Sequence, residues 1–400
     1  MSVKSRLSLM MFLQYAIWGS WSAVLSAYLL NIGFDGMQTG MIYSLLPLAT
    51  IISPFIGGQI ADRYFSTHKI ISFLQLSGGV VLIILSRITD YNTMFWLMLL
   101  YCLLYAPTLA LTNSISLANL ENSEKDFGGV RVWGSIGWIG AGLALSGWRL
   151  LAQRIGDISY AGDTLLLAGI FSIIMGIQAL SLPATPQKKT SGNPWAFIEA
   201  LKMLKNKNTA IFFLISFVVS TELMFYYVLT APFLTSSNIG IAETNVPAVM
   251  VIAQFAEIFV MALLLPRFLP KYGFRKTMAI GVIAWPLRYI IFAVGAPPWL
   301  VVASLALHGF CYVFFFTAAF IYVDVIAPKD IRASAQSLIT LIILGLGNYF
   351  GSLFAGWIKT QFTIGEITNW RGIFIVPCIL TFLCATAFML IFKEDKTAKN

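Results

Sequence analysis

Charged side chains are scarce in this sequence. Only 11% of its 400 residues are Asp, Glu, Lys or Arg, whereas 58% are hydrophobic. Soluble domains carry about 25% charged residues. The apolar residues fall in blocks of about 20, which is the length that a helix needs to cross the hydrocarbon layer of a bilayer. The composition therefore excludes a soluble globular domain and indicates an integral membrane protein.

Cysteine and histidine are also scarce, with four and two residues. Cys102, Cys311, Cys378 and Cys384 lie in apolar segments and form no CxxC pair, which argues against a disulfide or a metal site. No Ser-His-Asp set or zinc-ligand spacing is present, and the glycine-rich stretch at 345–351 follows no predicted strand. We therefore expect no enzyme activity, no metal and no cofactor.

Polar turns separate the apolar blocks at short intervals. The pattern predicts an all-α fold with about twelve membrane-spanning helices. The predicted spans lie at about 7–30, 36–60, 70–88, 93–118, 129–150, 162–183, 208–234, 245–266, 275–294, 298–323, 334–358 and 371–392.

The two halves of the chain resemble each other. The longest polar interruption, residues 184–206, separates six spans in residues 1–183 from six in 207–400, and we expect it to be a cytoplasmic linker. The fifth and eleventh spans both begin with an arginine, in VRVWGS (130–135) and IRASAQ (331–336), and then become glycine-rich. Two pseudo-symmetric halves are typical of many transporters, whose substrate site lies between them near the midplane.

The net charge of +9 reflects the distribution of Lys and Arg along the connections. Because these residues concentrate in the even-numbered connections and near both ends, the positive-inside rule predicts cytoplasmic termini. We therefore expect a lipid bilayer and no nucleic acid as the partner of this charge. The odd-numbered connections hold only Arg87, Arg149, Arg154, Lys359 and Arg371.

The connection after the second span has a recognisable pattern. GGQIADRYF (57–65) resembles the loop signature of the major facilitator superfamily, in which an Asp-Arg pair lies between the second and third spans. The resemblance implies that Asp62 and Arg63 form a cytoplasmic gate. Phe65 and Ser66 depart from the end of that signature, so the latch is altered.

Three ionisable residues lie deep in predicted spans of the second half: Glu222, Glu257 and His308. Such residues are costly in a membrane and usually face a cavity or a partner. Each carboxyl can serve a substrate or proton site, or can form a structural ion pair with Arg288. His308 can be a hydrogen-bonded core residue or a proton relay.

Arg131 raises a similar choice in the fifth span. At the start of a helix it can extend its guanidinium to the interface and act as an anchor. Ser135 follows four residues later and lies on the same helical face. An arginine and a hydroxyl on one face also suit a hydroxylated solute, and the spacing leaves both interpretations open.

Several stretches together resemble the nucleoside–proton symporter family of the major facilitator superfamily. They are FLQYAIWGSW (12–21), APTLALTNSIS (106–116), VRVWGSIGW (130–138), KNKNTAIFF (205–213), QFAE (254–257) and IRASAQ (331–336). The resemblance implies a twelve-helix carrier of the bacterial inner membrane that imports nucleosides with protons by alternating access. We expect a monomer. The alternatives are a carrier of the same fold for another hydroxylated metabolite, such as a sugar or glycoside, and a non-transporting membrane receptor.

The resemblance also implies site residues. The family's nucleoside-binding arginine and hydroxyl match Arg131 and Ser135, its aromatic residue matches Trp138, and its Gln and Glu on the eighth span match Gln254 and Glu257. We expect Glu257 to carry the coupled proton, with His308 and Glu222 as further candidates.

Other positions depart from the family pattern. The two amide contacts of the seventh span align with Met224 and Tyr227. On the tenth span the family's Tyr, Phe and acidic residue align with His308, Tyr312 and Val313. Lost amide partners would leave polar groups of a nucleoside unpaired, at about 1–3 kcal/mol each. We therefore expect a retuned pocket, with Tyr227 and Tyr312 as aromatic walls.

Overall fold

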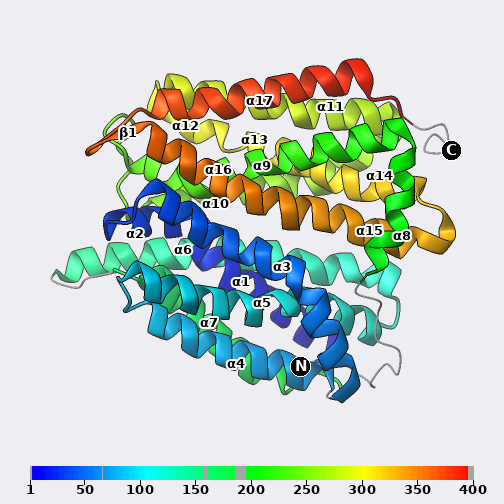
Figure 1. Cartoon of the computed structure of the whole chain (residues 1–400). Helices are drawn as coiled ribbons and strands as arrows, with labels where there is room; N and C mark the ends of the chain where they lie inside the picture. Colours follow the sequence, from blue (N-terminus) through cyan, green and yellow to red (C-terminus); the bar gives the residue numbers. More distant parts are fainter. Residues whose placement is uncertain (1, 65, 157–160, 185–194, 395–400) are drawn as a thin grey trace. The chain divides into compact units, whose positions relative to one another are not determined.

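The computed structural model describes residues 2–64, 66–156, 161–184 and 195–394. These residues are helical except for short connections and one hairpin, in which strand β1 (Thr363–Ile364) pairs antiparallel with β2 (Ile367–Thr368). Among them, seven helical paths are long and apolar enough to cross a membrane, and one of these runs 49 residues from Val246 to Val294. The predicted all-α membrane fold is confirmed, and each predicted apolar block falls on a helical path (Figure 1).

The chain divides into two compact units. The first comprises Met1–Asn193 and Ile241–Val251. The later segment belongs here because Arg149 donates to the Glu243 carbonyl (3.2 Å) and Ser146 accepts from the amide of Ala248 (2.9 Å). Within this unit α1 packs against α6 and α7, and α5 packs against α3 and α4. Its helices are α1 (Val3–Trp21), α2 (Leu25–Asn31), α3 (Gly36–Tyr64), α4 (Thr67–Leu85), α5 (Tyr91–Asn119), α6 (Ser123–Ile155) and α7 (Asp163–Ala179).

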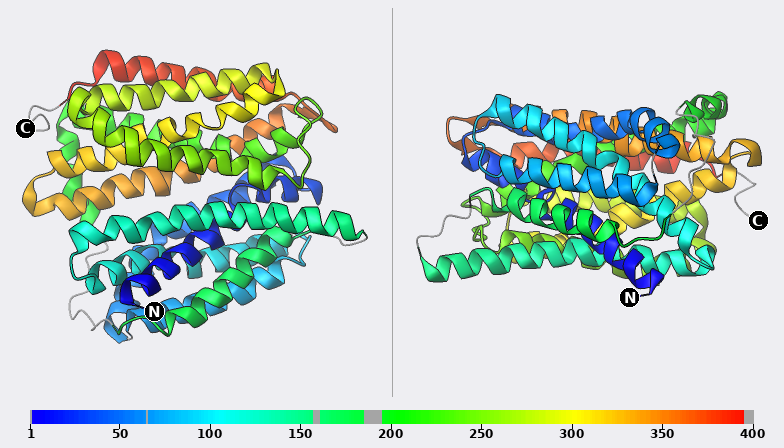
Figure 2. Two further views of the ribbon diagram at one scale, coloured as in Figure 1. Left: turned by 180° about the vertical axis from the view of Figure 1, so that it is seen from behind. Right: turned by 90° about the horizontal axis from the view of Figure 1, so that it is seen from below.

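The second unit comprises Pro194–Gly240 and Ile252–Asn400. Here α11 packs against α17 and η3, and α9 packs against α16 (Figure 2). Three of its segments, η2, η3 and η5, are π-helical. The helices that follow α7 are α8 (Ala196–Ala200), η1 (Leu201–Lys205), α9 (Lys207–Thr235), α10 (Val246–Phe259), η2 (Val260–Leu264), α11 (Leu265–Val294), α12 (Pro298–Ser304), α13 (Leu307–Gly309), η3 (Phe310–Thr317), α14 (Ala318–Ile326), η4 (Lys329–Ile331), α15 (Arg332–Thr340), η5 (Leu341–Gly347), α16 (Asn348–Gln361) and α17 (Trp370–Ile391).

Three predicted connections differ from the structure. Helix α3 continues to Tyr64 and so covers much of the predicted loop 57–69, while the side chains of Asp62 and Arg63 lie outside the described residues. The predicted loop 266–276 is helical on both sides of Gly273, whose φ of 73° breaks the helix. Of the predicted linker 184–206, residues 185–194 also lie outside the described residues, and α8 and η1 form most of the remainder.

Glycines let helices approach closely in both units, as the glycine-rich spans predict. A Cβ on Gly137 of α6 would lie 2.0 Å from the carbonyl oxygen of Phe12 in α1. A Cβ on Gly351 of α16 would lie 2.5 Å from the carbonyl oxygen of Thr221 in α9. Small residues at such crossings allow backbones to pack without an intervening side chain, which drives association of helices in a membrane.

A buried polar network joins four helices of the first unit. Gln14 donates to the hydroxyl of Thr108 (2.9 Å), and Gln75 donates to the side-chain oxygen of Gln14 (2.9 Å). Ser172 in turn donates to Gln75 (2.7 Å). Because Gln14 is fully buried and bonded on both sides, it serves the packing of α1, α4, α5 and α7.

Arg149 lies inside α6 rather than in a connection. Its guanidinium forms a bidentate pair with Asp163 at the start of α7, at 2.8 and 2.7 Å, and both side chains are buried. The predicted connection begins later because α6 continues to Ile155. Removing one partner of such a pair would leave an uncompensated buried charge.

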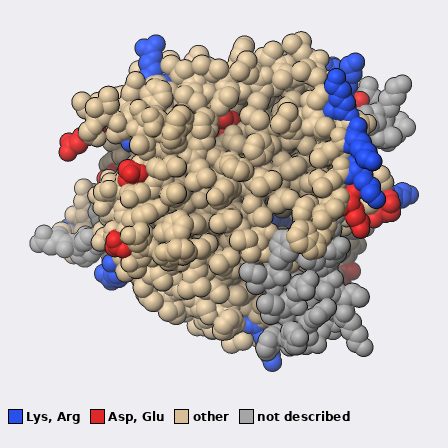
Figure 3. Space-filling model, viewed as in Figure 1, with Lys and Arg blue, Asp and Glu red and all other residues tan. Residues whose placement is uncertain are grey.

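Large apolar side chains cover the outer faces of the helices. Phe73, Trp96, Leu214 and Phe382 are among those that are well exposed. On the face drawn in Figure 3, Lys, Arg, Asp and Glu occupy little of the surface. A surface with many apolar side chains and few charges suits contact with lipid.

Candidate substrate site

Arg131 stacks on an aromatic ring in the first unit. Its guanidinium carbon lies 4.1 Å from the centre of the Tyr15 ring of α1. Gly134, on the next turn of α6, leaves room for this contact, because a Cβ there would lie 2.7 Å from both Arg131 Nη1 and the Tyr15 ring. An arginine over a tyrosine face gains about 0.5–2 kcal/mol, depending on its desolvation. The guanidinium is therefore held within the helix packing.

Two tryptophans extend this cluster. The ring of Trp18 lies 6.2 Å from Tyr15 and 5.4 Å from Trp138 of α6. Gly19 allows this approach, because a Cβ there would lie 2.8 Å from the Trp138 backbone. The structure thus brings the predicted residues Arg131 and Trp138 into one aromatic cluster with α1. Ser135 is half-buried on the same helix, one turn beyond Arg131.

The second unit carries an irregular helix at His308. Helix α12 ends at Ser304, the amides of His308 and Gly309 bond to carbonyls three residues earlier (3.0 and 3.2 Å), and the π-helix η3 begins at Phe310. Segments of π-helix occur frequently at functional sites. Irregular backbone at membrane depth is tolerated where it is buried in protein or lines a cavity. Both observations favour a functional role for this segment.

Three tyrosines surround the His308 imidazole. Its ring is stacked on Tyr226 at 4.5 Å and on Tyr312 at 5.8 Å, with interplanar angles of 25° and 27°. Tyr227 meets it edge-on at 6.3 Å. The structure therefore brings together Tyr227, His308 and Tyr312, as the resemblance implies, and adds Tyr226.

Arg288 of α11 completes this cluster. It is fully buried, and its Nη1 lies 3.1 Å from His308 Nδ1. Its guanidinium carbon lies 4.6–5.1 Å from the ring centres of Trp285, Tyr226 and Tyr289. Arg288 Nε and Nη2 have no hydrogen-bond partner within the described part of the chain.

Gln254 and Glu257 lie one turn apart on α10, next to this cluster. Gly309 brings the two segments together, because a Cβ there would lie 2.5 Å from the carbonyl oxygen of Ala256 and 3.0 Å from the amide of Glu257. Glu257 is half-buried and interacts electrostatically with Tyr226 and Tyr227. Gln254 is buried, and its side-chain oxygen finds no partner among the described residues.

Glu222 is fully buried in α9, one turn before Tyr226. Its backbone carbonyl accepts from the Tyr289 hydroxyl, and its carboxyl lies 3.3 Å from the Thr221 hydroxyl. Within the described part of the chain no ion pair joins Glu222 to Arg288, whose Nη1 bonds to His308. The structure thus does not form this pair, and the role of Glu222 stays a prediction.

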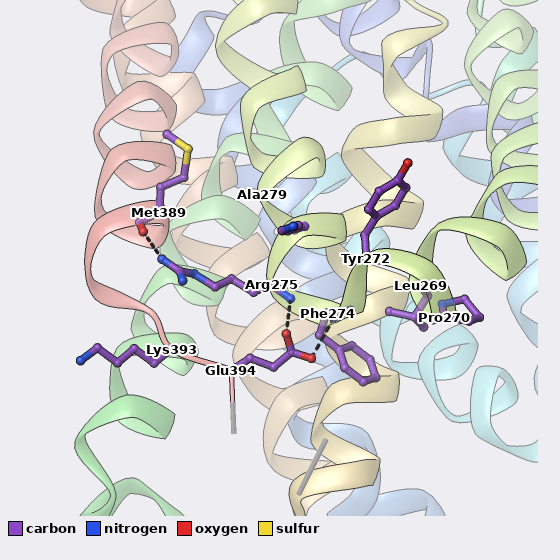
Figure 4. Close-up of a pocket in the computed structure, with 11 residues that line it drawn as sticks. Leu269, Pro270, Tyr272, Phe274, Arg275, Ala279, Met389, Lys393 and Glu394 are labelled. Carbon is purple, nitrogen blue, oxygen red and sulfur yellow. Dashed lines mark hydrogen bonds between the residues drawn. The ribbon is translucent and has the colours of Figure 1, made fainter. Parts of the chain in front are cut away.

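A surface pocket lies elsewhere in the second unit, at the break in α11 (Figure 4). The Glu394 carboxylate accepts from the amides of Phe274 and Arg275 at 3.1 and 3.3 Å, and Arg275 donates to the Met389 carbonyl. These bonds attach the chain beyond α17 to the helix that restarts after Gly273. The pocket holds none of the predicted site residues.

Sequence reasoning missed three members of these clusters. Tyr15 and Tyr226 were visible only as aromatic residues in apolar spans, although Tyr15 precedes Trp18 by three residues and so shares its helical face. From the sequence, Arg288 stands out only as a partner for a buried carboxyl. Its contact with His308 depends on how α11 is rotated against its neighbours, which the sequence does not reveal.

Comparisons with known proteins show the family of this chain. The sequence pattern of the nucleoside H+ symporter family matches residues 1–397. The transporter YegT of Escherichia coli K12 is 35% identical over 99% of this chain and 95% of its own. The nucleoside permease NupG of the same organism is 31% identical over 98% and 96%. A crystal structure of a NupG mutant superposes with a TM-score of 0.89 at 28% identity, over 98% of this chain and 100% of that one. The chain therefore belongs to the nucleoside H+ symporter family.

Proposed function

We propose that this chain imports nucleosides by proton symport through alternating access. The family match over nearly the whole chain supports this function, as does the similarity to the nucleoside permease NupG and to the xanthosine permease of Escherichia coli K12. The observation that carries the proposal is a set of buried polar atoms of His308, Gln254 and Arg288 that find no hydrogen-bond partner among the described residues. Buried polar groups normally form hydrogen bonds, so a polar solute can supply the partners that these atoms lack.

In the first unit, Arg131 and Ser135 bind the nucleoside. The guanidinium offers donors in a rigid fork that suits ribose hydroxyls or the acceptor atoms of a base. Trp138 supplies an aromatic wall. The Tyr15 ring supports the guanidinium, whose central carbon lies 4.1 Å from the ring centre. The cation–π contact thus holds Arg131 in place for binding.

In the second unit, Gln254 and Glu257 bind polar atoms of the nucleoside. Tyr227 and Tyr312 supply apolar or stacking surfaces in place of the family's amide and phenylalanine. Met224, which aligns with the family's other amide contact on this span, is buried in α9. A site with fewer amides discriminates less through hydrogen bonds to the base and relies more on stacking.

Glu257 carries the coupled proton. Its carboxyl is half-buried beside Gln254, so it can exchange a proton and also sense the substrate. Protonation removes its charge and lets the loaded carrier reorient. Glu222, which is fully buried, and His308 are the other candidates in this unit.

The protein is a multi-pass protein of the bacterial inner membrane. We place both termini and residues 184–206 in the cytoplasm because Lys and Arg concentrate in those connections. Asp62 and Arg63 form the cytoplasmic gate, and the carrier works as a monomer.

Uptake by membrane vesicles tests this function. Vesicles that contain the protein receive radiolabelled uridine, adenosine, xanthosine, uracil, glucose or maltose, with and without an inward proton gradient. We expect saturable, gradient-stimulated uptake of one or more of the nucleosides and not of the sugars. Uptake of a sugar alone would instead establish the carrier of another hydroxylated metabolite, and uptake of none would favour a receptor.

A further inference from the structure

We infer that Arg288 holds His308 as a neutral imidazole with its proton on Nε2, and that this N–H donates to an acceptor atom of the nucleoside base. Arg288 thereby acts as a positioning residue, and His308 acts as a binding residue and not as a proton carrier. The inference rests on the proposed nucleoside transport for the identity of the ligand, whereas the state of His308 follows from contacts inside one unit.

The donor and acceptor roles follow from the chemistry of the two side chains. A guanidinium has N–H donors and no acceptor. The contact of 3.1 Å between Arg288 Nη1 and His308 Nδ1 therefore requires a lone pair on Nδ1. A neutral imidazole with a lone pair on Nδ1 carries its proton on Nε2.

Stacking fixes the plane of this ring. Tyr226 and Tyr312 both lie nearly parallel to the imidazole. Rotation of the ring out of its plane would break these contacts, and a flip within the plane would remove Nδ1 from Arg288. The direction of the Nε2–H bond is therefore set before any ligand arrives, which lowers the entropic cost of binding.

The Nε2 donor has no acceptor in the part of the chain that the structure describes. His308 is fully buried, yet Nε2 finds no hydrogen-bond partner among the described residues. A buried donor without an acceptor costs free energy that a ligand oxygen or ring nitrogen can recover. The Gln254 side-chain oxygen, an unpaired acceptor on the neighbouring α10, can complement it. A nucleobase presents such donors and acceptors side by side on one edge.

The same contacts argue against proton transfer through His308. A second proton would have to occupy Nδ1, which would break the bond to Arg288 and place two cations against each other. Arg288 itself is held by the faces of Trp285, Tyr226 and Tyr289. The titratable and charged groups near His308 are Arg288 of α11, Tyr226 and Tyr227 of α9, Glu257 of α10, and Cys311 and Tyr312 of η3. Of these, Glu257 remains for the coupled proton.

Nitrogen NMR reads the state of His308 directly. The chain has two histidines, so His68→Gln with a purification tag free of histidine leaves His308 as the single imidazole. We expect 15N-histidine spectra of this protein in detergent at pH 7.5 to show one neutral tautomer with the proton on Nε2. Arg288→Met, an apolar replacement of similar length, should give signals averaged between the two tautomers.

Binding measurements test the role of that state. In an equilibrium binding assay with whichever radiolabelled nucleoside the wild type takes up, His308→Phe keeps a flat ring but loses the donor, so binding should weaken about 10-fold. His308→Gln, whose amide N–H can replace Nε2–H, should bind within about threefold of the wild type. Arg288→Met should weaken binding in the wild-type background and have no further effect in His308→Gln, because an amide has no tautomer to fix.

These results separate the inference from its alternatives. A proton on Nδ1, an imidazolium, or His308→Phe binding as tightly as the wild type would overturn it. An equal weakening of nucleoside binding by Arg288→Met in the wild type and in His308→Gln would reduce Arg288 to a structural role. That result would overturn its assignment as a positioning residue. If no nucleoside binds, the proposed function fails, and the NMR spectra still decide the tautomer.

Discussion

Arg131 lies where a guanidinium can serve either as an anchor or as a ligand. Its contact with Tyr15 places it in the packing between α1 and α6. Arg131 lies eight residues after Ser123, where α6 begins, and Gly134 leaves room for it beside the Tyr15 ring. These contacts show how the guanidinium is held, and substrate binding by Arg131 stays a prediction.

Arg131→Ala should abolish saturable nucleoside uptake while the folded protein persists in the membrane. A hydrogen bond from a charged donor is worth about 1.5–3 kcal/mol, so affinity should fall roughly 10- to 150-fold. Arg154→Ala, at an exposed position near the end of the same helix, is the matched control and should transport normally. Normal transport by Arg131→Ala would make this arginine an interfacial anchor.

Glu257→Gln should lose gradient-driven accumulation and retain exchange of labelled for unlabelled nucleoside. The amide imitates the protonated carboxyl, so the loaded carrier can reorient but gains nothing from the proton gradient. Both activities are measured in the same vesicles, with Glu366→Gln, in an exposed turn, as control. Undiminished nucleoside accumulation by Glu257→Gln would show that another group carries the coupled proton. Glu222 would be the next residue to test.

The candidate site could be predicted from the sequence only where one helix supplies the pattern. Arg131, Ser135 and Trp138 follow each other along α6, so their spacing reveals a shared face. Arg288 and His308 lie on different helices, and their contact depends on helix rotation. A single sequence constrains that rotation weakly because apolar side chains surround each span.

Glycine residues determine which helices can pack with their backbones in close contact. Gly137 of α6 crosses α1 so closely that no side chain fits, whereas Gly147 on the same helix faces open space within 4 Å. The sequence identifies both residues as glycine in an apolar span. Only the structure distinguishes a glycine required by packing from one that packing does not require.

Gly137→Ala should therefore destabilise the folded protein, and Gly147→Ala should not. The added Cβ would lie 2.0 Å from the Phe12 carbonyl oxygen, and forcing atoms into a packed interior costs about 1–3 kcal/mol, sometimes more. Thermal unfolding in detergent, followed by fluorescence-detected size exclusion, measures this difference. Equal melting temperatures for the two variants would show that α1 and α6 are not packed this closely.

The positions of the spans were predictable, and their internal breaks were not. The apolar block 298–323 reads as one helix by hydropathy, but the structure divides it into α12, α13, η3 and α14. Hydropathy measures how strongly the side chains of a segment prefer an apolar environment. It does not report which carbonyl each amide bonds to, and that choice produces the irregular backbone at His308.

The distribution of Lys and Arg along the entire chain predicts its orientation in the membrane. In a version without Cys102, Cys311, Cys378 and Cys384, Ser237→Cys should react with an impermeant maleimide in intact cells. Ser191→Cys should react only after the cells are broken, because the Lys-rich connections are retained in the cytoplasm. Labelling of Ser191→Cys in intact cells would reverse the topology.

In the proposed function, one protein couples the movement of a nucleoside to that of a proton. The purified protein is reconstituted into liposomes that contain a pH-sensitive dye, with no proton gradient, and a transported nucleoside is added outside. We predict that the lumen acidifies as the nucleoside enters, and that Glu257→Gln liposomes take up the nucleoside without this change. Nucleoside entry through the wild-type protein with no change in luminal pH would contradict symport.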